Sequence, residues 1–176
     1  ATLSSGAMQI NVYTDIFLGN KDANGADGIA FVLQPVSTSL GEAGLDLGYG
    51  GIVPSEAVEF DTYQNVDRAD PAYDHVAIMK EGVGFHNTTA NMAGPVRIIP
   101  GVDNAEDGQI HSVRINWNAV SQELSVYVDC VLRTTANRDL VKDVFGGNPE
   151  VFWGFTGATG GLSNIHNFCL KYVSFT

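Results

Sequence analysis

Apolar and polar residues alternate with a period of two along several short segments of the chain, which predicts β-strands. In residues 110–117, for example, Val113, Ile115 and Trp117 fall on one face of a strand, and polar residues fall on the other. The strands predicted in this way cover residues 8–18, 29–34, 75–80, 96–99, 110–117, 124–132, 151–155 and 168–175, together with a strand that begins at Val58.

Residues 29–34 form a nearly continuous apolar run, which predicts a strand that is covered on both faces. Residues 139–145 are compatible with one or two helical turns, and no long amphipathic helix pattern is present. Segments rich in glycine separate the predicted strands. The pattern therefore predicts an all-β chain folded as a sandwich or a barrel.

The strand that begins at Val58 carries a row of oxygen donors on one face. This face presents, in order, Glu59, Asp61, Tyr63 and Asn65, and the chain then turns and returns with Asp70 and His75. Carboxylates brought into one site repel one another unless they bind protons or cations. The segment therefore predicts a metal site, and the alternative is an acidic strand edge followed by a solvated loop.

Two ligand sets can be drawn from these residues, and Asp61 and Asp70 would bridge them. A set with one imidazole suits Mn²⁺ or a similar transition ion. A set made only of oxygen atoms, including a main-chain carbonyl and an amide oxygen, suits Ca²⁺. The first set is Glu59, Asp61, Asp70 and His75, and the second is Asp61, the Tyr63 carbonyl, the Asn65 side chain and Asp70.

Composition narrows the possible partners. The 176 residues are most simply one domain, spanning residues 1–176, that is long enough to bury a sizeable core. The formal net charge of −11 and the absence of a basic patch argue against nucleic acid as a partner. No apolar run approaches the length of a membrane span, so membrane insertion is not expected.

The acidic segment resembles the metal motif of the L-type lectins, the legume lectin family. That motif reads E-x-D-x-[YF]-x-N, then D-P, then a histidine five residues after that aspartate, and residues 59–75 match it throughout. The resemblance implies a two-sheet antiparallel jelly-roll sandwich that binds Ca²⁺ and Mn²⁺, or another transition ion. It also implies a protein that binds glycans, as polysaccharide or glycoprotein, and is not an enzyme.

A second motif, Gly25-Ala26-Asp27-Gly28, resembles the family's A-D-G sequence and would be a plain turn if it stood alone. The resemblance implies that Asp27 is the main sugar acceptor and that the Ala26–Asp27 peptide is cis. A carboxylate accepts two strong hydrogen bonds, which suits adjacent sugar hydroxyls. Asn65 can give its oxygen to calcium and its amide hydrogens to a sugar, and Tyr63 can pack its ring on the sugar.

A third motif is the glycine-rich segment of residues 156–164, which lacks the ending of a phosphate-binding loop. It resembles the specificity loop of L-type lectins, and its A-T-G-G-L sequence is similar to that of mannose-binding animal cargo receptors. The resemblance implies that the N–H groups of Gly161 and Leu162 donate to a mannose- or glucose-type sugar. Legume lectins place a glycine three residues before the glycine of an L-G pair, and this chain has Leu45 at that position, next to Gly44. The leucine side chain narrows the expected sugar pocket.

The two cysteines, Cys130 and Cys169, lie in β-like segments and can either pair or remain free thiols. We expect a disulfide, because the glycine content and the exposed oxygen chemistry fit an extracellular domain. The short length predicts a module of a larger secreted or surface protein, such as a bacterial adhesin. His86, His111 and His166 lie outside the metal motif and are expected to be structural or surface residues.

Two other functions are compatible with this fold. A glycoside hydrolase would need two opposed carboxylates in a cleft, and Glu59 and Asp61 can be proposed for that role. The strand lacks the second glutamate of the E-x-D-x-x-E pattern, and metal ions would occupy both acids. A spacer domain that uses calcium only for stability is the second alternative, and an intact Asp27 and Asn65 argue against it.

Overall fold

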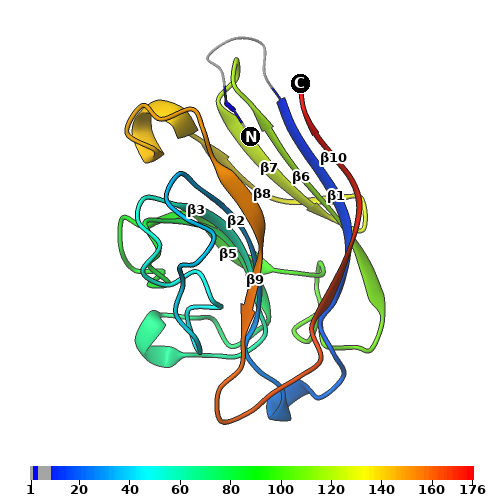
Figure 1. Ribbon diagram of the computed structural model, residues 1–176. Helices are drawn as coiled ribbons and strands as arrows, with labels where there is room; N and C mark the ends of the chain where they lie inside the picture. Colours follow the sequence, from blue (N-terminus) through cyan, green and yellow to red (C-terminus); the bar gives the residue numbers. More distant parts are fainter. Residues whose placement is uncertain (1, 4–8) are drawn as a thin grey trace.

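Two five-stranded β-sheets face each other in the computed structural model, which describes residues 2–3 and 9–176 (Figure 1). The back sheet has the order β10-β1-β6-β7-β8, and the front sheet has the order β5-β4-β3-β2-β9. The back strands are β1 Gln9–Phe17, β6 Ile110–Asn118, β7 Glu123–Val128, β8 Val131–Asn137 and β10 Asn167–Phe175. The front strands are β2 Gly28–Gln34, β3 Glu56–Asp61, β4 His75–Lys80, β5 Asn91–Arg97 and β9 Phe152–Ala158. All the pairs within each sheet are antiparallel, so the predicted all-β sandwich is confirmed.

The main core lies between the sheets and is built from the inward-facing residues of both. Phe31, Phe60 and Ile78 come from the front sheet, and Val12 and Ile115 come from the back sheet, each at most 2% exposed. Full burial of such a side chain contributes about 1.5–3 kcal/mol relative to leaving it in water. The alternation read from the sequence therefore places these residues correctly.

A second, smaller apolar cluster covers the outer face of the front sheet. Leu47, Tyr49 and Ile52 come from the long connection between β2 and β3, and they pack on outward-facing residues such as Val32 and Met79. Every residue of β2 is buried, which confirms the predicted strand with both faces covered. The same connection also covers the outward-facing acids of β3, as described below.

The predicted strand over residues 124–132 is wrong at its end, because the chain reverses there. Asp129 and Cys130 form a two-residue hairpin turn with φ angles of 48° and 65°. Two positive φ values are what a tight hairpin between twisted strands requires. The strand β8 that follows was not predicted, and Leu132 belongs to it.

Other element boundaries differ modestly from the prediction. The strand β5 begins at Asn91, five residues before the predicted start, and β9 continues to Ala158 into the segment predicted as a loop. The predicted helical turns appear as one π-helical turn, η3, over Leu140–Val144. The predicted first strand begins at residue 8, which lies outside the described residues.

The predicted disulfide between Cys130 and Cys169 is wrong, because both cysteines are free and exposed. Cys169 lies on β10, where it pairs with Asp15 of β1, whereas Cys130 lies at the turn between β7 and β8. Three strand spacings of ~4.8 Å separate these positions, or roughly 14 Å. Two Cα atoms farther apart than ~7 Å cannot be bridged.

Three loops meet at one end of the front sheet. Gly28, the first residue of β2, pairs with Asp61 at the end of β3 and with Ala158 at the end of β9. The segment before β2 carries the short helix η1, Asp22–Asn24, and the segment after β3 carries η2, Val66–Arg68. Figure 1 shows both helices at the lower end of the sandwich. The three motifs of the sequence therefore converge.

Candidate functional site

The acids of β3 point away from the main core. Phe60 faces inward, so Glu59 and Asp61 face the outer side of the front sheet, beneath the connection between β2 and β3. Glu59 is only 3% exposed and Asp61 only 4%. Burial raises the pKa of Asp61 well above its ordinary value, and the negative charges of Glu59 and Asp70 raise it further. Such buried acids need a cation or a proton.

The loop after β3 brings further ligands to these acids. Asp61 and His75 are register partners in β3 and β4. The turn around η2 ends at Ala69, which adopts a left-handed conformation, and returns Asp70 to the same place. Ligand atoms of Asp61, Asp70 and His75 all lie within 4.8 Å of one another. Burial also raises the pKa of Asp70 to about 6.

His86 lies in the same cluster, although the sequence predicted a structural or surface residue. Its Nε2 is 2.9 Å from Nε2 of His75 and 3.2 Å from Oε1 of Glu59. The same atom lies 3.4 Å from Oδ1 of Asp70. Ligand atoms of Glu59, His75 and His86 form a second group within 4.8 Å. The motif spacing of the family could not reveal His86, because this residue reaches the site from beyond the end of β4.

Two residues of the predicted oxygen-only ligand set donate backbone hydrogen bonds to the other two. Asp61 Oδ1 accepts a hydrogen bond of 2.8 Å from the Tyr63 N–H, and Asp70 Oδ2 accepts one of 2.6 Å from the Asn65 N–H. These bonds fold the loop around the two carboxylates. The side-chain oxygen of Asn65 is buried and has no hydrogen-bond partner among the described residues. An orphaned oxygen beside two carboxylates fits a calcium ligand.

Asp27 lies beside this cluster and the peptide Ala26–Asp27 is cis, as the family resemblance implied. The Asp27 carbonyl accepts a hydrogen bond of 2.9 Å from the Thr62 N–H, which ties it to the end of β3. The charge of Asp27 contributes to the raised pKa of Asp61. Asp27 is 5% exposed, and its Oδ2 is buried with no partner in the described part of the chain. Burial raises its own pKa.

The glycine-rich loop closes over Asp27. A Cβ placed on Gly160 would lie 3.7 Å from Asp27 Oδ2, so the loop backbone passes close to the carboxylate. The Asn164 N–H donates to the Ala26 carbonyl at 3.1 Å, which joins the two loops. Gly161 is exposed, a Cβ placed on it would contact nothing within 4 Å, and Leu162 is half-buried.

Gly44 and Leu45 lie in the connection between β2 and β3. Leu45 is 37% exposed, and a Cβ on Gly44 would contact nothing within 4 Å. The next residue, Asp46, accepts a hydrogen bond of 3.1 Å from Arg68 of η2. This ion pair joins the connection to the loop of residues 62–74 between β3 and β4, which we call the metal-motif loop. Tyr63, at 37% exposure, presents its ring at the surface of that loop.

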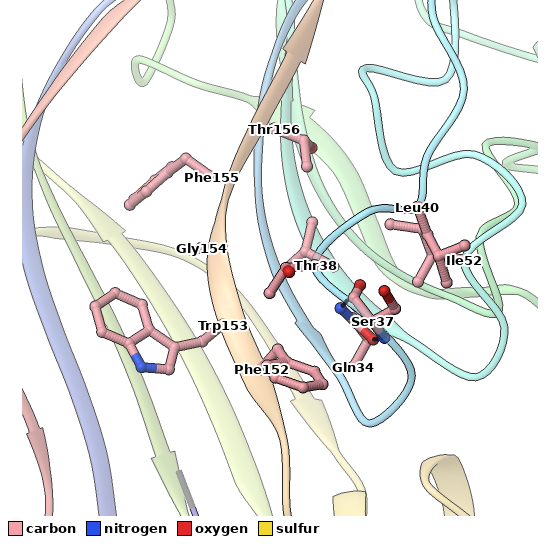
Figure 2. Close-up of a pocket in the computed structure, with 11 residues that line it drawn as sticks. Gln34, Ser37, Thr38, Leu40, Ile52, Phe152, Trp153, Gly154, Phe155 and Thr156 are labelled. Carbon is pink, nitrogen blue, oxygen red and sulfur yellow. Dashed lines mark hydrogen bonds between the residues drawn. The ribbon is translucent and has the colours of Figure 1, made fainter.

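An apolar recess lies farther along the front sheet (Figure 2). Phe152 and Thr156 of β9 border it, opposite Thr38 and Leu40 of the β2–β3 connection, while the Trp153 ring points to the other side of β9. Its lining includes no charged residue and none of the predicted sugar or metal residues. The recess is therefore separate from the acidic site.

The other two histidines lie elsewhere. His111 is held on β6 by Asp129 at 2.7 Å and by Asp107 at 3.2 Å, which confirms its structural role. His166 follows the glycine-rich loop and lines a recess with Phe155 and Phe168. Among the described residues, no helix is long and apolar enough to span a bilayer.

The chain is similar in sequence to known plant lectins. A sequence profile described as the legume lectin beta-barrel domain matches residues 8–172. The galactose-binding lectin of Arachis hypogaea is 30% identical over 168 residues, covering 89% of this chain and 55% of the relative. Lectin-4 of Griffonia simplicifolia is 44% identical over 117 residues, covering 62% of this chain and 44% of the relative. The chain spans about half the length of the curated relatives that it matches.

Solved structures of lectins are also similar to this chain. Basic winged bean lectin, solved with Tn-antigen, has a TM-score of 0.68 and 26% identity, covering 93% of this chain and 68% of that one. The lectin from Bauhinia forficata in complex with GalNAc has a TM-score of 0.72 and 21% identity, covering 99% and 74% of the two chains. At 21% identity the likeness shows the fold alone. The curated relatives are plant proteins and give no support for a bacterial origin.

Proposed function

Because the chain belongs to the legume lectin family, we propose that it binds carbohydrate through Asp27 and that bound calcium supports this site. Lectin domains of this family are non-enzymatic, so the glycoside hydrolase alternative is set aside. One observation carries the proposal. Side-chain oxygens of Asp27 and Asn65 are buried without hydrogen-bond partners among the described residues. Asn65 donates its N–H to Asp70, and Asp27 directly precedes Gly28, which pairs with Asp61.

In this proposal the metal-motif loop holds two cations. Asp61, the Tyr63 carbonyl, Asn65 and Asp70 hold calcium, which suits their hard oxygen atoms. Glu59, Asp61, Asp70 and His75, the set that the sequence motif predicts, would hold a transition ion such as Mn²⁺. The cations supply positive charge that offsets the repulsion among the buried acids. The Asp61 and Asp70 carboxylates accept hydrogen bonds from the backbone of the metal-motif loop. These bonds fix the loop in the conformation that orients the Asn65 amide.

The sugar lies over Asp27 in this proposal. The Asp27 carboxylate accepts hydrogen bonds from two adjacent hydroxyls, and the Asn65 amide donates a further one. The backbone N–H groups of Gly161 and Leu162 donate from the glycine-rich loop. The exposed ring of Tyr63 packs on the apolar face of the sugar, with Gly44 and Leu45 at the border of the pocket.

Two observations about the class of sugar point in opposite directions. The A-T-G-G-L sequence of the glycine-rich loop predicts mannose- or glucose-type sugars. The names of similar proteins instead mention galactose and GalNAc. An aspartate carboxylate accepts from adjacent hydroxyls in either class. We therefore propose a hexose site within a larger secreted or cell-surface protein, and the exposed Leu45 side chain at its border contributes to the preference between the two classes.

A glycan array tests this function directly. The protein is applied with calcium and Mn²⁺ present, and again after chelation, to an array that carries both mannose- and galactose-terminated glycans. The proposal expects binding to one class in the metal-loaded protein and its loss in the chelated protein. A metal-loaded protein that binds no glycan, while remaining folded, would favour the calcium-stabilised spacer domain instead.

A further inference from the structure

We propose that His86 is an additional protein ligand of the transition ion, so that this site holds its cation with two imidazoles. The inference rests on the proposed metal site and goes beyond the ligand set that the motif implies, which contains the single histidine His75. It predicts a site that prefers Zn²⁺, Ni²⁺ or Co²⁺ over Mn²⁺ more strongly than a site with one imidazole does.

The distances around His86 fit one coordination shell. Ligand atoms ~2.1 Å from one cation lie about 3.0 Å apart in adjacent octahedral positions and about 3.4 Å apart in tetrahedral ones. The two Nε2 atoms of His75 and His86 are 2.9 Å apart, and His86 Nε2 is 3.2 Å from Glu59 Oε1. The distances from His86 Nε2 to Asp70 Oδ1 and from His75 Nε2 to Glu59 Oε1 are 3.4 and 3.8 Å. Ligand atoms of Glu59, His75 and His86 all lie within 4.8 Å of one another, so a single cation can contact these three residues.

The surroundings of His86 hold its ring in the site. Its side chain is 4% exposed. The His86 N–H donates to the Arg68 carbonyl at 2.9 Å, and its own carbonyl accepts from Asn91 Nδ2 at 3.0 Å. The Arg68 guanidinium lies 3.9 Å from the centre of the neighbouring Phe85 ring. The segment that carries His86 is thus fastened to the metal-motif loop on one side and to β5 on the other.

The electrostatic setting also favours ligation over simple packing. Oε1 of Glu59 is buried and has no hydrogen-bond partner in the described ranges. Two facing imidazoles can satisfy each other only if one is a donor and the other an acceptor. A cation would instead use both Nε2 lone pairs together with the orphaned Glu59 oxygen. Imidazole ligands suit Zn²⁺, Ni²⁺ and Cu²⁺, whereas carboxylate and water suit Mn²⁺.

Metal titration and spectroscopy test the inference on the intact chain. The wild-type protein, His86→Gln and the control His111→Gln are stripped of metal and titrated with Zn²⁺ and with Mn²⁺ by calorimetry. Each protein is also loaded with one equivalent of Cu²⁺, and pulsed electron paramagnetic resonance counts the imidazole nitrogens coupled to the copper. His86→Ala serves as a second variant, since its short side chain offers no ligand.

We expect two coupled imidazoles in the wild-type protein and in His111→Gln, and one in both His86 variants. We also expect the Zn²⁺ affinity to fall at least about tenfold in His86→Gln, with a smaller loss for Mn²⁺. One imidazole in the wild-type protein, or unchanged Zn²⁺ affinity in both His86 variants, would overturn the inference. A wild-type protein that binds no metal would overturn the proposed metal site as well. Two imidazoles in a protein that binds no glycan would support the inference while contradicting the carbohydrate function.

Discussion

The hydroxyl of Tyr49 donates a hydrogen bond of 2.6 Å to Oε2 of Glu59. Tyr49 is fully buried in the apolar cluster on the outer face of the front sheet. The bond therefore links the packing of the β2–β3 connection to a proposed metal ligand. It fixes one carboxylate oxygen of Glu59 and leaves the other, Oε1, turned toward the two histidines.

Tyr49→Phe should weaken transition-metal binding without removing it. The variant keeps the packing of the ring but leaves Oε2 of Glu59 buried without its donor, which costs about 1–3 kcal/mol. Loss of a hydrogen bond that orients a metal ligand typically lowers metal affinity by about 10–100-fold. Calorimetric titration with Zn²⁺ measures the change, and Tyr127→Phe on the back sheet is the matched control. Equal affinities in the two variants would show that the Tyr49 hydroxyl does not position Glu59.

Asp61→Ala should abolish the stabilisation that metal ions give. A ligand at 100–1,000 times its Kd stabilises a protein by about 2.7–4.1 kcal/mol, so chelation should lower the stability of the wild-type protein by that order. The variant should be insensitive to chelator. Because burial and neighbouring charges raise the pKa of Asp61, its removal should leave the metal-free protein no less stable. Denaturant unfolding with and without chelator measures both effects.

Asp67→Ala, which removes an exposed acid from the same loop, is the control for that experiment. It should respond to chelator as the wild-type protein does. If Asp61→Ala retained the full response to chelator, the metal ions would have to bind elsewhere in the chain.

Glu106 should make the protein less stable as the pH rises. Burial raises its pKa from 4.5 to about 7, against the opposing effect of the hydrogen bond from Asn164. The folded state therefore holds a proton that the unfolded state releases, so the stability is fully present below about pH 4.5 and declines up to pH 7. Since solvent screens part of the effect, we expect a loss of about 1–2 kcal/mol from this group.

Glu106→Gln tests this pH dependence. The amide oxygen can still accept the hydrogen bond that Asn164 Nδ2 donates to Glu106, so the contact between the loops is retained. The decline between pH 4.5 and 7 in denaturant unfolding should be smaller in this variant by about 1–2 kcal/mol, whereas Glu123→Gln at an exposed position should show the full decline. A decline of the same size in Glu106→Gln would assign the pH dependence to other groups.

Cys130→Gly should stabilise the hairpin between β7 and β8. Cys130 has a φ of 65°, a conformation that glycine adopts without a steric cost, and Asp-Gly is a preferred pair for such a turn. We expect a gain of up to about 1 kcal/mol in thermal unfolding. Cys169→Gly within β10 should instead lose stability, because glycine weakens a strand. A gain in both variants would point to an effect of removing a thiol.

Much of this fold can be predicted from the alternation of apolar and polar residues. The residues of β4, from His75 to Lys80, agree with the prediction at both ends. The hairpin at Asp129 and Cys130 could not be predicted, because the segment lacks glycine and reads as one continuous strand. The predicted disulfide was wrong for a related reason. Local sequence does not show where in a sheet a strand will lie, so it does not show how far apart the two cysteines are.

Part of the acidic site could be predicted from the sequence, and part of it could not. Asp61, Asp70 and His75 lie in one strand, its return loop and the first residue of the paired strand, so their convergence follows from local geometry. His86 and Tyr49 reach the same site from a turn beyond β4 and from the long β2–β3 connection. Their places depend on how these connections pack over the front sheet, and no spacing in the sequence expresses that packing.

In the proposed function, Asp27 binds the sugar while the metal ions hold the loops around it. Asp27→Asn keeps the size of the side chain and removes one acceptor, so it separates binding from folding. Truncating one partner of a buried charge-assisted pair typically costs about 2–5 kcal/mol in affinity, which is enough to remove weak monosaccharide binding. Asp22→Asn in the nearby helix η1 is the control, because that acid is exposed.

The decisive measurement is glycan binding by Asp27→Asn beside the wild-type protein, with calcium present and thermal unfolding recorded on the same samples. We expect no detectable glycan binding in Asp27→Asn, a melting temperature close to that of the wild-type protein, and normal binding in Asp22→Asn. Glycan binding by Asp27→Asn with wild-type affinity would place the sugar site elsewhere and contradict the proposed role of Asp27.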